Sequence, residues 1–425
     1  MIIHPQVSLH RLVLSLSEAL DCVHPKIADH QQRVAYLVLR LSQRLGMDKS
    51  KLFDGFLAAA LHDIGLVRTE HKLKLLRLDA LESILWHSEV GFRLLKDHPL
   101  FAGPAEIVRY HHEPWAGGRG AERDGRPIPL LSHVLVLADT VERSIDRDRF
   151  VLDQAEPIMD RITRGGADRF HPDVVRAFLE EAEAPAFWLD CVSRRIYERM
   201  LNEMDWPAIT LDERGIEPIA RLFARVVDAA SRWTATHSAG VAAVAVALAE
   251  RLQFSPRELG LMRTAGYLHD LGKLAVPTDV LEKASGLDDR EWRLIRAHTY
   301  YTFHILDTVG GMPQISEWAA FHHERLDGRG YPFRHRAHDL ALGSRIMAVA
   351  DTFTAITEDR PYRAGMPRDK ALSALQHVVE NGGLDGNVVA VLAEHFDDVN
   401  AIRAREEKAY AEQQDVFADI LPASP

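Results

Sequence analysis

Two adjacent histidines open the stretch HHERLDGRGYP at residues 322–332, and they belong to a longer ordered set of residues that could bind metal. The set lies in the second half of the chain and consists of His237, His269, Asp270, His298, His322, His323 and Asp351. Imidazole and carboxylate groups without thiolate suit Fe, Mn, Zn, Co or Ni. Seven ligands are too many for one tetrahedral ion. They suit two ions that share an aspartate and activate a water for attack on a phosphoryl group.

The same ordered set occurs a second time in the first half of the chain. Its members are His30, His62, Asp63, His87, His111, His112 and Asp139. The motifs ALHDIG (60–65) and YLHDLG (267–272) differ by 207 positions, as do His30 and His237. A repeat of this kind indicates a tandem duplication. We therefore expect one domain at 1–205 and a second at 206–425, joined near Pro207.

Helical periodicity surrounds both sets. An apolar residue recurs on one helical face after each first histidine, at Val34, Leu37, Leu41 and Leu45 and at Val241, Val244, Leu248 and Leu252. The stretch SPRE at 255–258 has the pattern of a capping box. The apolar stretch LGSRIMAVA at 342–350 fits a buried helix better than a strand. Because no long alternating run indicates a sheet, we predict an all-α protein.

Composition excludes several classes of protein. The chain has 425 residues, a formal charge of −11 and only two cysteines. An acidic protein has no general attraction for nucleic acid, so we expect no nucleic-acid partner. Two cysteines cannot form a disulfide framework and suit a reducing compartment. The N-terminal stretch does not resemble a signal peptide, and no apolar run is long enough to span a membrane. We therefore expect a cytoplasmic protein without a membrane anchor.

The motifs of the second half resemble the HD-GYP branch of the HD superfamily of metal-dependent phosphohydrolases. The resemblance covers roughly 230–390 and rests on LHDLGKLAVPTDVLEK (268–283), IRAH (295–298), HHERLDGRGYP (322–332) and RIMAVADTFTAITEDRPYR (345–363). It implies an all-helical fold, here two tandem HD-type domains packed as a pseudo-dimer. It also implies a bacterial phosphodiesterase that opens cyclic di-GMP, or the related cyclic GMP-AMP. The implied cofactors are two divalent ions for each active site, most commonly iron or manganese.

The resemblance also assigns roles to individual residues. The seven residues of the second set match the family's metal ligands, with Asp270 as the bridging one. Lys273 matches the lysine that contacts the substrate phosphate. Arg363 lies where an arginine can hold a second phosphate or a guanine. Gly330 and Tyr331 belong to the turn that names the branch, which either contacts substrate or only shapes the site as a rigid loop.

Two positions in the second half depart from the family pattern. Trp233 occupies the place of a glutamate that recruits a third metal in some members, so we expect two ions. Thr354 replaces a frequent aspartate, which could reduce activity or change a hydrogen bond around the ligands.

The first half keeps every ligand position but has lost the groups that handle substrate. Leu66 stands at the lysine position, HHEPWAGGRG (111–120) lacks a Tyr-Pro turn, and DRDRF (146–150) replaces the RPYR region. We expect a domain that holds metal but has weak or no activity. A second active site and an empty structural copy are the alternatives.

Two other functions remain open at this stage. One is a different HD phosphohydrolase that acts on a nucleotide. The other is a non-catalytic scaffold that binds metal or dinucleotide and contacts a signalling partner. For either function we expect a homodimer or contact with other signalling proteins. Lys273 and the complete second ligand set favour catalysis.

Overall fold

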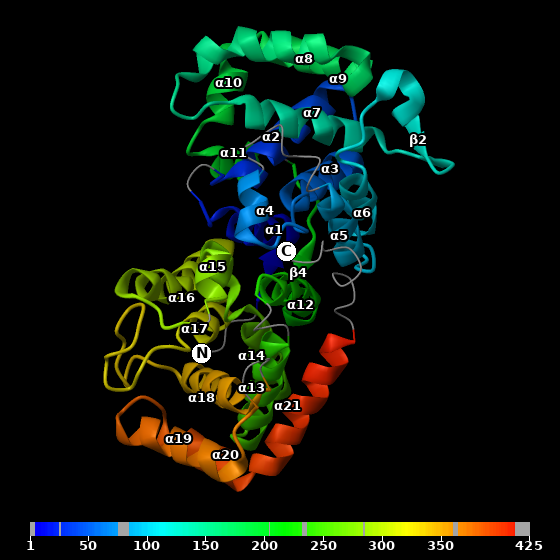
Figure 1. Cartoon of the computed structure of the whole chain (residues 1–425). Helices are drawn as coiled ribbons and strands as arrows, with labels where there is room; N and C mark the ends of the chain where they lie inside the picture. Colours follow the sequence, from blue (N-terminus) through cyan, green and yellow to red (C-terminus); the bar gives the residue numbers. More distant parts are fainter. Residues whose placement is uncertain are drawn as a thin grey trace. The chain divides into compact units, whose positions relative to one another are not determined.

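A computed structural model describes residues 5–24, 27–74, 85–203, 205–231, 236–283, 285–359 and 364–412. The chain divides into two compact units (Figure 1). The first domain is residues 9–209. The second domain begins at residue 210 and also includes strand β1 near the N-terminus. The roles we expect for the two domains, and their packing as a pseudo-dimer, stay predictions.

The first domain is a sequence of helices with one small hairpin. Its elements are α1 (Leu9–Asp21), α2 (His30–Arg44), α3 (Lys49–Leu61), α4 (Thr69–Lys74), α5 (Trp86–Leu95), α6 (Ala102–Arg109), η2 (Ala116–Ala121), β2 (Glu122–Arg123), β3 (Arg126–Pro127), α7 (Leu130–Ser144), η3 (Val151–Gln154), α8 (Ala155–Arg169), α9 (Pro172–Ala182), α10 (Pro185–Cys191) and α11 (Ile196–Glu203).

The second domain has a similar helical content. Its elements are β1 (Val7–Ser8), β4 (Thr210–Leu211), α12 (Glu213–Ala229), α13 (His237–Arg251), α14 (Pro256–Leu268), η4 (Leu271–Ala275), α15 (Thr278–Leu281), α16 (Asp289–Val309), α17 (Pro313–Ala320), α18 (Leu342–Thr357), α19 (Arg368–Glu380), α20 (Gly386–Glu394) and α21 (Phe396–Ala411). Strands β1 and β4 pair antiparallel, with Val7 opposite Leu211.

The predicted all-α class is confirmed. Within the described ranges the strands are two residues long and form two small antiparallel pairs. The segment 342–350 is helical, as expected, and lies in α18. In the part of the chain that the structure describes, no helix has the length and apolar character needed to cross a membrane.

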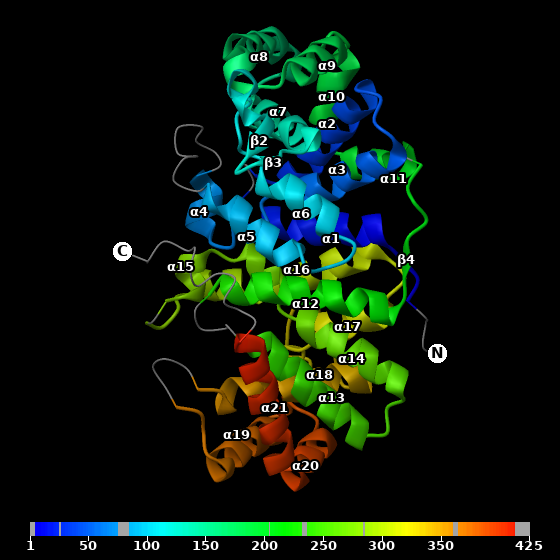
Figure 2. The ribbon, with the colours of Figure 1, turned by 90° about the vertical axis from the view of Figure 1, so that its right-hand side faces the viewer.

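Each domain repeats the same core of packed helices. Helix α2 packs against α3 and α7, and α13 packs in the same way against α14 and α18. Helix α5 packs against α6, as α16 does against α17 (Figures 1 and 2). The apolar stripes explain this packing, because Val34 and Leu37 in α2 and Val241 and Val244 in α13 are completely buried. In each domain these helices bring the residues of that domain's ligand set together.

Local sequence fixes where the ligand-bearing helix of the second domain begins and ends. Ser255 and Glu258 form the predicted capping box at the start of α14, and Pro256 occupies its first turn. The helix ends at Leu268, which leaves His269 and Asp270 at its C-terminus. Gly272 then allows the chain to pass against α16, because a Cβ atom there would lie 2.0 Å from the carbonyl oxygen of His298.

Candidate metal centres

The structure brings the seven residues of the second set into one buried cluster, here called the second centre. His237 is the first residue of α13, His269 and Asp270 follow α14, and His298 lies within α16. His322 and His323 follow the end of α17, and Asp351 lies in α18. Two trios, His298 with His322 and His323 and His237 with His269 and Asp351, each place their ligand atoms within 4.8 Å of one another.

Asp270 lies between the two trios, and its two oxygens face different histidines. Oδ2 lies 3.2 Å from Nε2 of His269 and 4.0 Å from Nε2 of His237. Oδ1 lies 3.4 Å from Nε2 of His298 and 4.0 Å from Nε2 of His322. This arrangement is the one a carboxylate needs to bridge two ions.

Backbone carbonyls orient three of the histidines. Nδ1 of each ring donates to a backbone carbonyl oxygen three residues earlier, at 2.6 to 2.7 Å. His269 donates to Gly266, His298 to Ile295 and His322 to Ala319. A carbonyl oxygen can only accept, so the proton lies on Nδ1 and the lone pair of Nε2 is free for a cation. Burial lowers the pKa of His298 to about 3, which keeps this imidazole neutral as a ligand must be.

A carboxylate that the sequence analysis did not identify orients His237, the first ligand of the second centre. Oε2 of Glu358 lies 3.2 Å from Nδ1 of His237, and Nε2 of the same ring faces Asp351 at 3.1 Å. A carboxylate on the outer nitrogen of a histidine raises its basicity as a metal ligand. Thr354, the departure noted in the sequence, is buried one helical turn before Glu358.

Lys273 lies beside this cluster with its ammonium 2.5 Å from Oδ2 of Asp270. About a fifth of its side chain, 21%, remains exposed, so the ammonium is within reach of a ligand. Burial alone raises the pKa of Asp270, but its interactions with His269 and with the Lys273 ammonium outweigh burial and hold that pKa well below its usual range. Asp270 is therefore ionised at neutral pH.

A pocket of about 580 Å³ adjoins His323 and is lined by the turn that names the branch. Gly330 and Tyr331 line it, and the Tyr331 ring lies 5.0 Å from the His323 ring. Among the described residues its lining includes Arg296, Arg325, Arg329 and Arg334 and no acidic side chain. A cluster of arginines beside a metal cluster suits a ligand with more than one phosphate.

Glu324 holds the loop that forms this pocket, a role that no sequence motif indicated. Its carboxylate is buried and accepts from the backbone N–H groups of Phe333, Arg334 and His335 at 2.7 to 3.1 Å. The ring of Phe333 packs against Phe303 and Phe321. The loop is therefore rigidly supported whether or not its residues contact a substrate.

Two residues with expected roles, Arg363 and Trp233, lie outside the described residues. The proposed substrate contact of Arg363 and the effect of Trp233 on the number of metal ions stay predictions.

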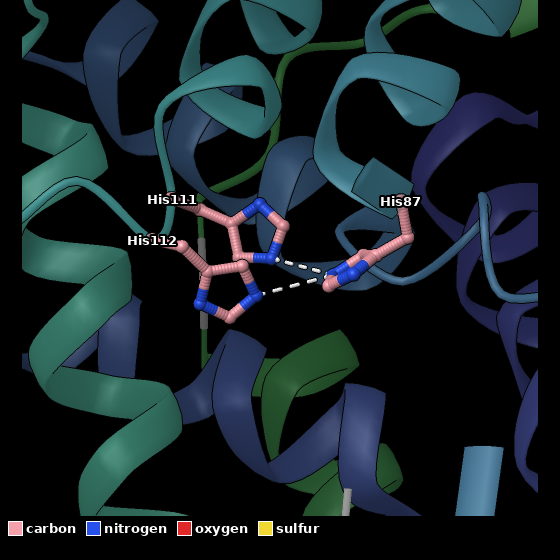
Figure 3. Close-up of side chains that lie close together, drawn as sticks. All are labelled: His87, His111 and His112. Carbon is pink, nitrogen blue, oxygen red and sulfur yellow. Dashed lines mark hydrogen bonds between the residues drawn. The ribbon is translucent and has the colours of Figure 1, made fainter. Parts of the chain in front are cut away.

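The first domain holds its seven residues in a matching cluster, here called the first centre. Oδ2 of Asp63 lies 3.2 Å from Nε2 of His62, and Oδ1 lies 3.0 Å from Nε2 of His87. Nε2 of His87 lies 3.1 Å from that of His111 and 3.2 Å from that of His112. Figure 3 shows these three rings pointing toward one another. Glu142 lies 2.6 Å from Nδ1 of His30, as Glu358 does near His237.

The donor atoms of both centres fit divalent cations. Nε2 of His30, His62 and His269 and one oxygen each of Asp63 and Asp139 are buried without a hydrogen bond among the described residues. Leaving such an atom unsatisfied costs about 1–3 kcal/mol. A bound cation would satisfy these lone pairs in both domains.

Each domain also contains an equivalent buried aspartate that the sequence analysis did not identify. Asp21 accepts from the backbone N–H of Gln31 at 2.8 Å, and Asp228 accepts from the hydroxyl of Ser238 at 2.7 Å. Burial raises the pKa of each carboxyl to about 7. Each bond tethers the residue after the first histidine ligand of its domain. The separation of 207 positions, equal to that of the histidines, was the available signal.

Comparisons with known families match both halves of the chain to the same kind of domain. One HD domain family model matches residues 219–388, and a second matches residues 27–144. The two matches coincide with the two clusters.

Characterised bacterial proteins are similar along much or part of the chain. The 3'3'-cGAMP-specific phosphodiesterase 1 of Vibrio cholerae is 30% identical over 91% of this chain and 91% of its own length. The cyclic di-GMP phosphodiesterase PA4108 of Pseudomonas aeruginosa is 39% identical over 37% of each chain. The crystal structure of the cyclic GMP-AMP-specific phosphodiesterase V-cGAP3 of V. cholerae matches with a TM-score of 0.65 and 26% identity. That match covers 92% of this chain and 98% of the other.

Proposed function

This chain belongs to the HD-GYP branch of the HD superfamily of metal-dependent phosphohydrolases, and on that premise we propose that its second domain hydrolyses a cyclic dinucleotide. The observation that carries the proposal is the second centre beside an arginine-lined pocket. The alternatives, a different nucleotide phosphohydrolase and a non-catalytic scaffold, are not favoured by the relatives.

The seven residues of the second centre are proposed to hold two divalent transition-metal ions, with Fe or Mn expected first. When bound, such ions supply Lewis acidity that activates water and stabilises charge on the phosphate. His269, His298 and His322 present Nε2 toward the cluster because their Nδ1 atoms are held by the backbone. Asp270 lies between the two trios and keeps them at a fixed separation.

Lys273 and the arginines act on the substrate itself. The ammonium of Lys273 neutralises charge that develops on the attacked phosphate. Arg296, Arg325, Arg329 and Arg334 hold the second phosphate and the sugars in the adjacent pocket, which fixes the scissile bond against the centre. The product of one cleavage is a linear dinucleotide.

We expect 3'3'-cyclic GMP-AMP to be the better substrate, with cyclic di-GMP as the second candidate. The support is that a relative named for 3'3'-cGAMP is similar along 91% of this chain, whereas PA4108 aligns with 37% of it.

A turnover assay of the full chain loaded with Fe(II) or Mn(II) tests this proposal. Both dinucleotides are supplied separately, and the products are separated by chromatography. We expect metal-dependent opening of at least one ring, and loss of turnover on chelation that returns when metal is restored. Failure of every loaded form to open either ring would overturn the proposed function.

A further inference from the structure

The first domain has a pocket in the position that the arginine-lined pocket has in the second domain. It has a volume of about 540 Å³ and adjoins His112, whose counterpart His323 adjoins the other pocket. His112 is one of the three rings drawn in Figure 3, so one ligand residue of the first centre also lines this pocket.

The charges of the two pockets differ. Leu85, two residues before His87, stands where Arg296 precedes His298, and Trp86 lines the pocket beside it. Both arginines of the first pocket already bind carboxylates, whereas in the second pocket Arg325 does so through Asp327 at 2.9 Å. Nε of Arg109 donates to Glu89 at 2.9 Å, and Arg123 pairs with Glu113. A ligand with several phosphates would therefore find little free positive charge here.

The first domain contains a buried lysine in a helix that has no part in the ligand set. Leu66 occupies the position equivalent to Lys273, so that lysine is missing from the first domain. Helix α4 contributes another lysine, Lys72, which is only 3% exposed. Lys72 lies within electrostatic range of Asp63 and Asp21. Their counterparts, Asp270 and Asp228, have the same relation to Lys273. The first domain therefore has a buried amine within electrostatic range of Asp63, supplied by a different helix, and burial lowers its pKa to about 8.

A second positively charged side chain, Arg143, contacts Asp139, the other aspartate of the first centre. Nη1 of Arg143 lies 3.3 Å from Oδ2 of Asp139, and the Arg143 side chain is almost fully buried. Lys72 and Arg143 balance the charges of Asp63 and Asp139. Any divalent ion bound there would add positive charge that an anionic ligand can neutralise.

From these features we propose that the first domain binds a nucleoside monophosphate. Its phosphate lies at the first centre near Lys72, and its nucleoside occupies the pocket beside His112, where Trp86 offers an aromatic surface for a base. This inference rests on the expectation from the sequence that the first centre holds metal. Complete hydrolysis of a cyclic dinucleotide releases such monophosphates, so the first domain can sense product.

The test measures binding of GMP and AMP to the full chain loaded with Mn(II), in an Asp270→Asn background that disables the second centre. Equilibrium dialysis is expected to give one nucleotide per chain, lost on chelation. Lys72→Met and Trp86→Ala should each weaken binding by about tenfold or more. Lys74→Met on the same helix and Trp292→Ala in the second domain are the matched controls and should bind as the background does.

Several outcomes would overturn the inference. They are no nucleotide binding, equal binding by the Lys72→Met, Trp86→Ala and control variants, free phosphate binding as tightly as GMP, or cyclic di-GMP binding more tightly than GMP. Melting temperature and metal content confirm that each variant is folded and loaded.

A measurement on the unmodified chain covers the case in which a variant fails to fold. Hydrogen exchange of the metal-loaded protein should show GMP-dependent protection in α4 and α5, and unchanged exchange there would contradict the proposal. Turnover of the same chain tests the second domain separately. Absence of turnover together with Lys72-dependent GMP binding would overturn the proposed function and leave this inference standing.

Discussion

Asp270 is the side chain on which both halves of the second centre depend, because each of its oxygens faces a different pair of histidines. Asp270→Ala should therefore lose metal and turnover together. Lys273 contacts Asp270 but has no lone pair for a cation while protonated, so Lys273→Ala should keep the metal. Its turnover should fall about 10²–10³-fold, the usual cost of removing one electrostatic donor from a transition state.

Metal content measured beside turnover for these two variants checks this difference. Loss of metal from Lys273→Ala would show that the lysine supports the ligands rather than the phosphate. Retention of two ions by Asp270→Ala would exclude a bridging role for the carboxylate.

The role of Glu358 can be recognised only in the folded structure. It lies 121 positions from His237 yet holds the outer nitrogen of that ring. Glu358→Gln keeps the shape but removes the charge, and it should weaken metal affinity about 10–100-fold. Competition with a chelator of known affinity measures the change, with Glu394→Gln on the same domain as a control. Unchanged affinity would mean that the contact does not tune the ligand.

At the scale of elements, the loop from Gly328 to His335 is held in place by Glu324 and by packing of Phe333. Gly330 approaches this support closely, since a Cβ atom there would lie 2.4 Å from the backbone nitrogen of Arg325. Gly330→Ala should displace the loop, raise KM for the dinucleotide and leave the metal content unchanged.

Gly286→Ala is the matched control for this loop, because a Cβ atom at Gly286 would meet nothing within 4 Å. Steady-state kinetics on both variants makes the comparison. A KM of Gly330→Ala equal to that of the control would show that the turn can move without affecting the substrate pocket.

The sequence predicted those elements whose signals are local. The apolar stripes of α2 and α13 and the capping box at Ser255 follow from residues a few positions apart, and the structure has them. The two clusters could be anticipated because the histidine and aspartate order occurs twice. Glu324 and Lys72 could not, because a buried charge is recognised only from what surrounds it. Their partners are fixed by tertiary packing and by backbone N–H groups that carry no sequence signal.

At the scale of the whole molecule, duplication has kept one helical core and changed the chemistry around it. Both centres present imidazole and carboxylate atoms in the same order. The second domain pairs its centre with a lysine and an arginine-rich pocket, and the first pairs its centre with Leu66 and arginines that already bind carboxylates. The difference favours one domain for hydrolysis of a multiply charged substrate and the other for binding without efficient hydrolysis.

This division of labour predicts how the chain responds to loss of the first centre. Asp63 has both oxygens directed at histidines of the first domain, so Asp63→Ala should remove metal from that domain. Turnover should remain largely intact, because Lys273 and the second ligand set are unchanged, while stability or regulation by ligand can change. The measurement is turnover of Asp63→Ala beside its metal content, with Asp270→Ala as the matched variant of the second domain. If Asp63→Ala abolishes turnover while the second domain stays folded and fully metallated, the first centre is itself catalytic or the two centres are obligately coupled.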